Sequence, residues 1–232
     1  KNNHKNHTIY GINNSINFLQ SRLKCSEVLI FINIKSPAIK NKSLLNLIKK
    51  FKFNTLDSKV FNQKFNFKHN QGIVIEFAAK ISKSIHDIDI SSENSSFVIC
   101  DQIQDPQNLG QIIRTCECSG INGIILPEHG SVHITNSVLQ VSQGAIFHIN
   151  LVIETNLNNT IKYLKENDFW IIGVENSIEA QNWYEMDFKG KIAIVVGSEG
   201  GGIRPLIKKS CDFLATIPMK GKINSLNVSA AI

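Results

Sequence analysis

Residues 192–219 read IAIVVGSEGGGIRPLIKKSCDFLATIPM, and their pattern is a strand, a glycine-rich turn, a helix and a second strand. The run Ile192–Val196 is short, apolar and rich in β-branched residues, as in strands buried on both faces of a parallel sheet. Gly197 and the glycines at 200–202 follow it and permit a tight turn with close approach of the backbone to a ligand. The stretch therefore predicts a β-α-β unit with a binding turn at the carboxyl end of its first strand.

Two common interpretations of a glycine-rich turn are excluded by the spacing of this one. A dinucleotide fingerprint requires glycine at its first, third and sixth positions, and Glu199 occupies the third. A nucleophile elbow requires serine two residues after the first glycine, whereas Ser198 comes one residue after Gly197. The turn therefore indicates neither a dinucleotide enzyme nor a serine hydrolase.

Short apolar runs alternate with helical patterns throughout residues 97–232. The predicted strands are Phe97–Asp101, Gly123–Pro127, Phe147–Ile153, Phe169–Val174, Lys191–Gly197 and Phe213–Met219. The predicted helices between them are Leu109–Ser119, Ser137–Gln143, Leu157–Glu166 and Ile203–Ser210. This alternation predicts an α/β fold with a mostly parallel sheet, helices on both faces, and ligands at the carboxyl ends of the strands.

The first 80 residues predict a smaller α/β domain. Its predicted elements are a helix over Tyr10–Gln20, a strand over Glu27–Ile34, a helix over Ser43–Phe53 capped by Ser43, and an apolar run over His69–Ala79. Residues 81–96 are rich in serine and charge, with little that could fill a core, so we expect a linker there. The predicted division is 1–80, linker 81–96 and 97–232.

Charge is distributed unevenly between these parts. Residues 1–94 hold 15 lysines and arginines against 6 acids, and residues 95–232 hold 10 against 13. A basic module suits a polyanionic partner, because neutralising phosphates provides most of the sequence-independent affinity for nucleic acid. An AT-rich genome would also produce a lysine-rich chain, so the lysine content alone leaves both explanations open.

Several classes of protein are disfavoured by the sequence. No apolar run approaches the roughly 20 residues that span a bilayer, and the first residues lack the apolar core of a secretory signal, so we expect a soluble cytoplasmic protein. An organelle location after removal of a transit peptide stays open. The five cysteines are odd in number and scattered, which favours reduced thiols. Cys116 and Cys118 would diverge on a helix, the histidines lack ligand spacing, and we expect no metal site.

Two further motifs place polar side chains where predicted helices begin. In DQIQDPQNLGQIIRT (Asp101–Thr115), a helix N-terminus and Arg114 could bind an RNA phosphate, although Asn108 could equally be a helix cap and Arg114 a surface ion-pair partner. In IPMKGKINSLNVSAAI (Ile217–Ile232), Ser225 and Asn227 could point into a cleft or cap a helix that starts near Val228. Each motif by itself is weak.

Together, DPQNLGQIIRT, VVGSEGGGIR and IPMKGKINSLNVS resemble, in order and approximate separation, the three signature motifs of the SpoU (TrmH-like) class of SPOUT RNA 2′-O-methyltransferases. HNQG at His69–Gly72 and YG at Tyr10–Gly11 resemble the RlmB subgroup, which methylates a guanosine ribose in bacterial 23S ribosomal RNA. The resemblance covers nearly the whole chain and is dense from Phe97 onward.

The resemblance implies S-adenosylmethionine as cofactor, RNA as substrate, a trefoil-knotted methyltransferase domain, an L30e-like RNA-binding domain before it, and a homodimer with active sites at the subunit interface. The catalytic positions that match the family pattern are Asn108, Arg114, Glu199, Ser225 and Asn227. The matching cofactor positions are Gly197, Ser198, Ile217, Pro218, Met219 and Leu226. The family arginine is proposed to activate the ribose hydroxyl; because a guanidinium has a pKa above about 12, we expect Arg114 to hold a phosphate instead.

The chain departs from the family pattern at its end. The family continues through a complete carboxyl-terminal helix that contributes to the dimer, whereas this sequence stops at Ile232 and has Ala231 or its neighbour where glycine is common. We therefore expect a shortened terminal helix. Two alternatives stay open, namely a transfer-RNA ribose methyltransferase and a non-catalytic RNA-binding or ribosome-assembly protein of the same fold.

Overall fold

The structure is a computed structural model that describes residues 5–223 and 225–232. The chain forms two compact units. The first unit comprises the residues up to Ile81 together with Ile134–His148, and the second comprises Ser82–His133 together with Ile149–Ile232.

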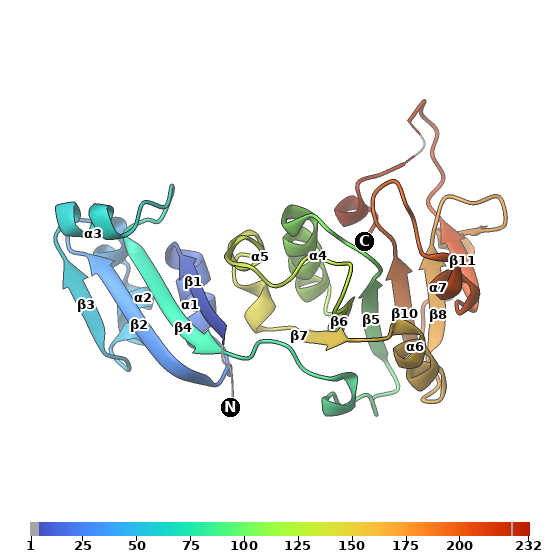
Figure 1. The fold of residues 1–232 in the computed structure, drawn as a ribbon, viewed down its shortest axis with the longest axis horizontal. Helices are drawn as coiled ribbons and strands as arrows, with labels where there is room; N and C mark the ends of the chain where they lie inside the picture. The colour runs from blue at the N-terminus through green and yellow to red at the C-terminus, as the bar shows by residue number, and fades with distance from the viewer. Residues whose placement is uncertain (1–4, 224) are drawn as a thin grey trace. The chain divides into compact units, whose positions relative to one another are not determined.

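The first unit is built on a four-stranded mixed sheet with the order β1-β4-β2-β3 (Figure 1). Its strands are β1 (Lys5–Tyr10), β2 (Cys25–Asn33), β3 (Phe53–Leu56) and β4 (Ile73–Ala79). Strand β4 runs antiparallel to both β1 and β2, while β2 and β3 are parallel. Its helices are α1 (Ile12–Gln20), η1 (Pro37–Lys40), α2 (Lys42–Ile48), α3 (Ser58–Lys64), α5 (Asn136–Val141) and η3 (Ala145–Phe147).

Aromatic residues form part of the core of this unit. Phe61 and Phe65, from α3 and its end, pack against Phe31 of β2 and Val74 of β4. On the other elements, α1 contacts β1, β4 and α2. Burial of these side chains provides the main stabilisation available to a unit of this size.

Segment 134–148 belongs to the first unit although it follows residues 82–133 of the second unit in the chain. The Asn14 side chain donates to the Leu139 carbonyl at 3.3 Å, and the Gln140 side-chain amide donates to the Tyr10 carbonyl at 3.1 Å. The sequence placed this segment in the second domain through its position in the chain alone. A helical pattern shows that one face is apolar, but it does not show which other element that face packs against.

The predictions for the first unit are confirmed in part. The helix at 10–20 and the strand at 27–34 are present with shifted ends. The helix over Ser43–Phe53 is wrong in its second half, because α2 ends at Ile48 and Phe53 begins β3. Its cap is also different, since the Asn41 side chain accepts from the Leu44 amide at 2.9 Å.

The second unit contains a seven-stranded sheet with the order β7-β6-β5-β10-β8-β11-β9 (Figure 1). Its strands are β5 (Ser95–Cys100), β6 (Gly123–Pro127), β7 (Asn150–Glu154), β8 (Trp170–Val174), β9 (Gln181–Asn182), β10 (Lys191–Val196) and β11 (Phe213–Thr216). Neighbouring strands are parallel, which confirms the predicted α/β class. The helices are α4 (Pro106–Cys118), α6 (Leu157–Lys165) and α7 (Pro205–Lys209), with the short 3-10 turns η2 (Ile85–Asp87), η4 (Trp183–Glu185) and η5 (Val228–Ala230).

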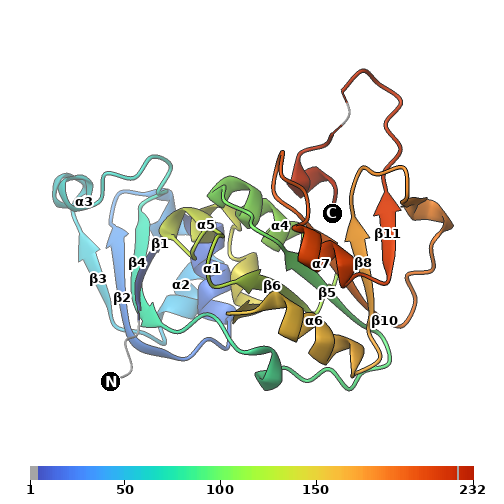
Figure 2. The same cartoon turned by 45° about the vertical axis from the view of Figure 1, so that its right-hand side comes forward.

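Helices cover both faces of this sheet. Leu164 of α6 and Ile207 of α7 share a core cluster with Ile99 of β5, and Figure 2 shows both helices in front of the sheet. Because successive strand side chains point to opposite faces, Cys100 points to the other face, where it lies near Cys116 of α4. The prediction of helices on both faces is therefore confirmed.

The expected linker at 81–96 contributes to this core. Ile85, Ile88 and Ile90 are buried in the same cluster, and the Ile85 amide donates to a Glu154 carboxylate oxygen at 2.7 Å. The expectation that this segment contributes little to a core was wrong. Its three isoleucines are enough to anchor it, because they pack against the core cluster of the second unit.

The strand order brings the first two motifs together. Strand β5 pairs with β10 so that Cys100 lies opposite Val196, and the Asp101 amide donates to the Val196 carbonyl at 2.7 Å. The loops that follow the two strands therefore start side by side at the carboxyl edge of the sheet. Within the described ranges, no helix has the length and apolar character needed to cross a membrane.

Candidate functional site

The glycine-rich turn after β10 doubles back on itself. The Ser198 amide donates to the Gly202 carbonyl at 3.2 Å, and the Gly202 amide donates to the Ser198 carbonyl at 3.0 Å. A Cβ atom at Gly197 would lie 2.0 Å from the Gly202 carbonyl carbon, so only glycine fits there. The turn projects Glu199 from the edge of the sheet.

An ion pair between the buried Asp101 and the partly exposed Arg204 holds the end of this turn. Asp101 is fully buried, and its Oδ1 accepts from the Arg204 Nε at 2.8 Å and from a terminal guanidinium nitrogen at 2.7 Å. Its Oδ2 accepts from the Arg204 backbone amide at 2.9 Å. Asp101 thus joins the end of β5 to the last residue of the turn.

Three predicted catalytic side chains form one hydrogen-bonded cluster. The Asn108 Nδ2 donates to the Glu199 Oε1 at 2.9 Å. The Asn227 Nδ2 donates to the same oxygen at 2.6 Å and to the Asn108 Oδ1 at 3.0 Å. These residues are far apart in the sequence, and each belongs to a different motif. We call them the Asn-Glu-Asn cluster.

The two amides of the cluster differ in whether they also cap a helix. Asp105, rather than Asn108, caps α4, because its carboxylate accepts from the Gln107 amide at 2.8 Å. Asn108 is therefore free to bond Glu199, and the capping alternative for its side chain does not hold. The Asn227 Oδ1 accepts from the Ser229 amide at 2.9 Å and from its hydroxyl at 2.5 Å, so Asn227 both caps η5 and completes the cluster.

Two cavities meet at Glu199. The larger has a volume of about 720 Å³, within the range of small-molecule sites, and the smaller has a volume of about 220 Å³. Ser198, Glu199 and Val228 line both. The smaller cavity is completed by Ile103, Gln104, Asp105 and Asn108. A single carboxylate therefore stands between two neighbouring spaces.

Most of the predicted positions surround these cavities. The predicted residues that line the larger cavity are Gly197, Ser198, Glu199, Ile217, Met219, Ser225, Leu226 and Asn227. Asn108 lines the smaller cavity. Pro218 is exposed and lines neither of the two.

Arg114 lies apart from the cluster on α4. Its side chain is exposed and does not line either cavity. Among residues 5–223 and 225–232 it forms neither a hydrogen bond nor an ion pair, so the surface ion-pair alternative finds no support. Its catalytic role stays a prediction.

Asp101, Arg204 and Ser229 were not singled out from the sequence. A signal existed for Asp101, because a carboxylate directly after a fully apolar strand must find a buried partner. Nothing in the local pattern named Arg204 as that partner, since 103 positions separate the two residues.

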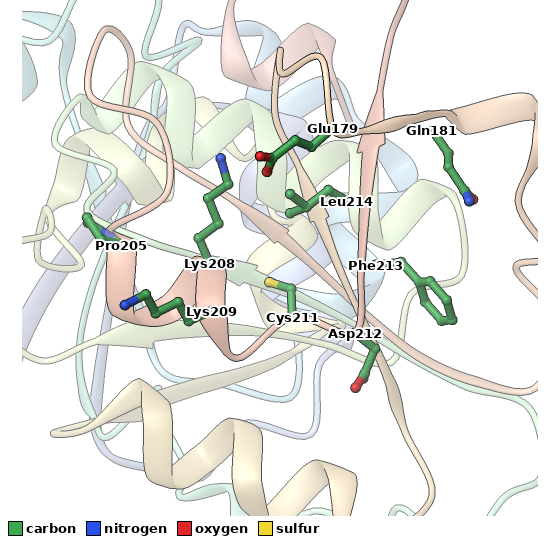
Figure 3. A pocket seen from close by; sticks show the side chains of 9 residues that line it. All are labelled: Glu179, Gln181, Pro205, Lys208, Lys209, Cys211, Asp212, Phe213 and Leu214. Atoms are coloured by element: carbon green, nitrogen blue, oxygen red, sulfur yellow. The ribbon is translucent and has the colours of Figure 1, made fainter.

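A further cavity of about 640 Å³ lies beside α7 and contains none of the predicted residues (Figure 3). Figure 3 shows Lys208 and Glu179 approaching one another across it, with Leu214 and Cys211 below. The Lys208 Nζ pairs with Glu175 at 2.7 Å, and the hydrogen bond with Glu175 raises the pKa of this lysine. The cavity is lined by two lysines, Lys208 and Lys209, and by two acids, Glu179 and Asp212, so it has no single charge preference.

Burial controls the thiol chemistry of this unit. Burial raises the pKa of Cys116 from 9.0 to about 12 and raises that of Cys211 to about 11. Such thiols are protonated at neutral pH and are poor nucleophiles. The described part of the chain has no group of three or more histidine, cysteine or acidic side chains placed to hold a metal.

Solved structures share the whole fold of the chain. An AdoMet-bound rRNA methyltransferase from Sinorhizobium meliloti superposes with a TM-score of 0.79 at 21% identity, over 97% of this chain and 83% of that one. A crystallised RNA 2′-O ribose methyltransferase superposes with a TM-score of 0.79 at 18% identity, over 98% and 85%. At these identities the likeness establishes the fold alone.

Sequence comparison places the chain in a family. A candidate TrmH family tRNA/rRNA methyltransferase of Staphylococcus saprophyticus is 47% identical over 137 residues, which are 59% of this chain and 55% of the relative. The chain thus matches only about half the length of that relative. The profile of the SpoU rRNA Methylase family matches residues 95–232, which include the glycine-rich turn, the Asn-Glu-Asn cluster and both cavities. The chain belongs to the SpoU rRNA Methylase family.

Proposed function

We propose that the chain is an RNA methyltransferase that transfers a methyl group from S-adenosylmethionine to the 2′-hydroxyl of a guanosine ribose in large-subunit ribosomal RNA. The observation that carries the proposal is the position of Glu199 between two cavities, held by Asn108 and Asn227. One space suits a methyl donor and the other the acceptor ribose. Family membership supports the same chemistry.

The residues of the larger cavity fit S-adenosylmethionine. Its volume of about 720 Å³ suits a molecule of that size, and Ile217, Met219 and Leu226 offer apolar surface for an adenine ring. The glycine-rich turn at Gly197 allows close approach of the backbone. When bound, the cofactor supplies an electrophilic methyl group on a sulfonium centre.

The protein's own task is positioning. A displacement of this kind requires the acceptor oxygen to be held about 3 to 3.5 Å from the methyl carbon. We assign this to the Asn-Glu-Asn cluster together with Ser225. The Glu199 Oε1 already accepts two hydrogen bonds, which leaves Oε2 to accept from a ribose hydroxyl. The hydroxyl proton then passes to the RNA phosphate fixed by Arg114, or to water.

The proposal includes the wider architecture that the sequence implies. It assigns a trefoil knot to the second unit, an L30e-like RNA-binding role to the first unit, and a homodimer to the assembly. An active site at the subunit interface would give the exposed Arg114 a route to RNA bound there. The high positive charge of residues 1–94 supports the RNA-binding role.

Transfer RNA is the second candidate substrate. The name of the staphylococcal relative includes both tRNA and rRNA, so the comparison favours neither. A non-catalytic RNA-binding protein is the third candidate. The intact Asn-Glu-Asn cluster argues against it, because RNA binding alone does not need two amides held around one carboxylate.

The test is transfer of labelled methyl from S-adenosylmethionine to total RNA from a strain that lacks the modification. Nuclease mapping then locates the labelled ribose. We expect 2′-O-methylguanosine in large-subunit ribosomal RNA. Label in transfer RNA would overturn the substrate and keep the chemistry. A folded protein that binds cofactor and RNA without any transfer would support the non-catalytic alternative.

A further inference from the structure

Three segments of the first unit are tied into one surface. The segments are Tyr10–Ile12, Asn33–Asn41 and Phe67–Gly72. The Ile12 amide donates to the Gln71 side-chain oxygen at 2.7 Å, and the Asn33 amide donates to the Gly72 carbonyl at 2.9 Å. We call these segments the basic-aromatic surface.

The turn at its centre is unusually constrained. His69 and Gln71 have φ values of 62° and 52°, which few residues other than glycine adopt. At Gly72, with φ of 78°, a Cβ would lie 2.0 Å from the Ser36 Cβ. Asn70 braces the turn by accepting from the Gly72 amide at 2.8 Å. Backbone held in such conformations is concentrated at binding sites.

Aromatic rings lead from the core to this surface in a row. Tyr10 and Phe67 are stacked with centroids 4.8 Å apart and planes 3° apart, and Phe65 continues the row at 6.4 Å from Phe67. Phe65 is buried, whereas Phe67 is 37% exposed and Tyr10 is half-buried. The row therefore presents pre-oriented aromatic surface to an incoming planar group at little cost in side-chain entropy.

Positive charge lies on the same basic-aromatic surface. A cavity of about 450 Å³ is lined by Ile12, Lys35, Ser36, Pro37, Lys40 and Asn41, with no acidic side chain among them. Lys68 is exposed beside Phe67. The whole first unit holds 14 lysines and arginines against three acids. Charge complementarity thus selects a polyanion as the occupant.

We infer that the basic-aromatic surface binds a single-stranded segment of the RNA substrate, with an unpaired base added to the Tyr10–Phe67 row and the neighbouring phosphates at Lys35 and Lys40. A flat ring recognises a base only when that base has left its helix, so an unpaired segment is required. The inference rests on the proposed function for the identity of the substrate as RNA.

The test uses a single-stranded RNA of about 12 nucleotides carrying one 2-aminopurine, whose fluorescence falls when it stacks. The variants are Phe67→Leu and Tyr10→Leu, which keep apolar bulk, and the double variant Lys35→Gln/Lys40→Gln. The controls are Phe53→Leu, at a position 41% exposed outside this surface, and Lys52→Gln. Folding is checked by circular dichroism, and the exposed lysine variants keep the test valid if an aromatic variant unfolds.

We expect the ring variants to weaken RNA binding at least about 5-fold and to abolish the 2-aminopurine quench. The lysine variant is expected to lower the slope of log affinity against log salt by about 1 to 2. The KM for RNA should rise. The kcat at saturating RNA and the affinity for the cofactor should both stay unchanged. Wild-type affinity in the ring and lysine variants, or equal binding of a duplex of the same length, would overturn the inference.

The outcomes separate this inference from the proposed function. RNA binding that depends on Phe67 without any methyl transfer would sustain the inference and overturn the proposed activity. Methyl transfer with the same KM for RNA in all of these variants as in the wild type would sustain the proposed activity and overturn the inference.

Discussion

The Asp101 carboxylate binds Arg204 at both its guanidinium and its backbone amide, with Oδ1 2.8 Å from Nε and Oδ2 2.9 Å from the amide nitrogen. Asp101 directly follows β5 and Arg204 ends the glycine-rich turn, so this contact joins the loops of two motifs. Because Asp101 is fully buried, the pair gives that junction one defined geometry. Glu199 lies on the turn so anchored.

Removing the guanidinium should therefore destabilise the second unit. Arg204→Ala leaves a buried carboxylate with one backbone donor, and we expect a loss of about 2 to 4 kcal/mol in the free energy of unfolding. Urea unfolding measures it as a lower midpoint at constant m-value. Lys209→Ala, an exposed position on α7, the helix that follows Arg204, is the control and should change stability by less than about 0.5 kcal/mol. Equal stability of the two variants would contradict the anchoring role.

The Asn-Glu-Asn cluster should govern transfer more than cofactor binding. Glu199→Ala removes the shared acceptor of Asn108 and Asn227, and we expect kcat to fall at least about 100-fold, as for loss of a group that stabilises the transition state. Cofactor affinity, measured by calorimetry, should change only a few-fold. Gln107→Ala, an exposed neighbour on α4, should behave as wild type. A nearly unchanged rate for Glu199→Ala would remove this residue from the site.

Arg114 should affect RNA methylation without affecting stability or cofactor binding. Because its side chain is exposed and unpaired among the described residues, Arg114→Ala should leave stability and cofactor affinity intact while methyl transfer is lost. Arg114→Lys should recover only part of the rate, since lysine cannot provide a bidentate contact to phosphate. Gln111→Ala, exposed on the same helix, is the matched control. Retention of most of the rate in Arg114→Ala would refute its assignment.

Gly197 should not tolerate a methyl group. A Cβ there would lie 2.0 Å from the backbone of Gly202, so Gly197→Ala must open the turn that borders the larger cavity. We expect cofactor affinity to fall at least about 10-fold, because misplaced backbone groups lose contacts that need fixed geometry. Gly221→Ala is the control, since its Cβ would meet nothing closer than 4.0 Å. Calorimetric titration with S-adenosylmethionine compares the two, and equal affinities would argue against the role of the turn.

Thiol reactivity should follow burial. Cys118 is exposed, whereas burial raises the pKa of Cys116 to about 12 and that of Cys100 well above its ordinary value. At pH 8, we expect a thiol reagent to label Cys118 rapidly and to reach Cys100 and Cys116 only after unfolding. Mass spectrometry of labelled peptides checks this. Labelling of Cys116 in the native protein at the rate of Cys118 would show that α4 opens.

The local sequence pattern was sufficient to predict the helices and strands whose apolar residues are strongly periodic. The apolar run Ile192–Val196 forms β10, and the helical spacing at 157–166 forms α6, because burial of such faces leaves few alternatives. Strand β1 was not predicted, because its sequence KNHTIY is mostly polar. The segment is extended because it pairs with β4, and a local pattern does not show that pairing. The same holds for β3, whose residues are mostly exposed and which is defined by its ladder with β2.

The sequence by itself determined the α/β class, the three motifs and their membership of one site, because residue type and spacing carry that information. Only the tertiary structure decided that Asp105 rather than Asn108 caps α4, that Asp101 meets Arg204, and that segment 134–148 joins the first unit. Each of these contacts joins groups through space, and its outcome depends on which donors and acceptors remain unsatisfied once the sheets are assembled. No single stretch of sequence contains that information.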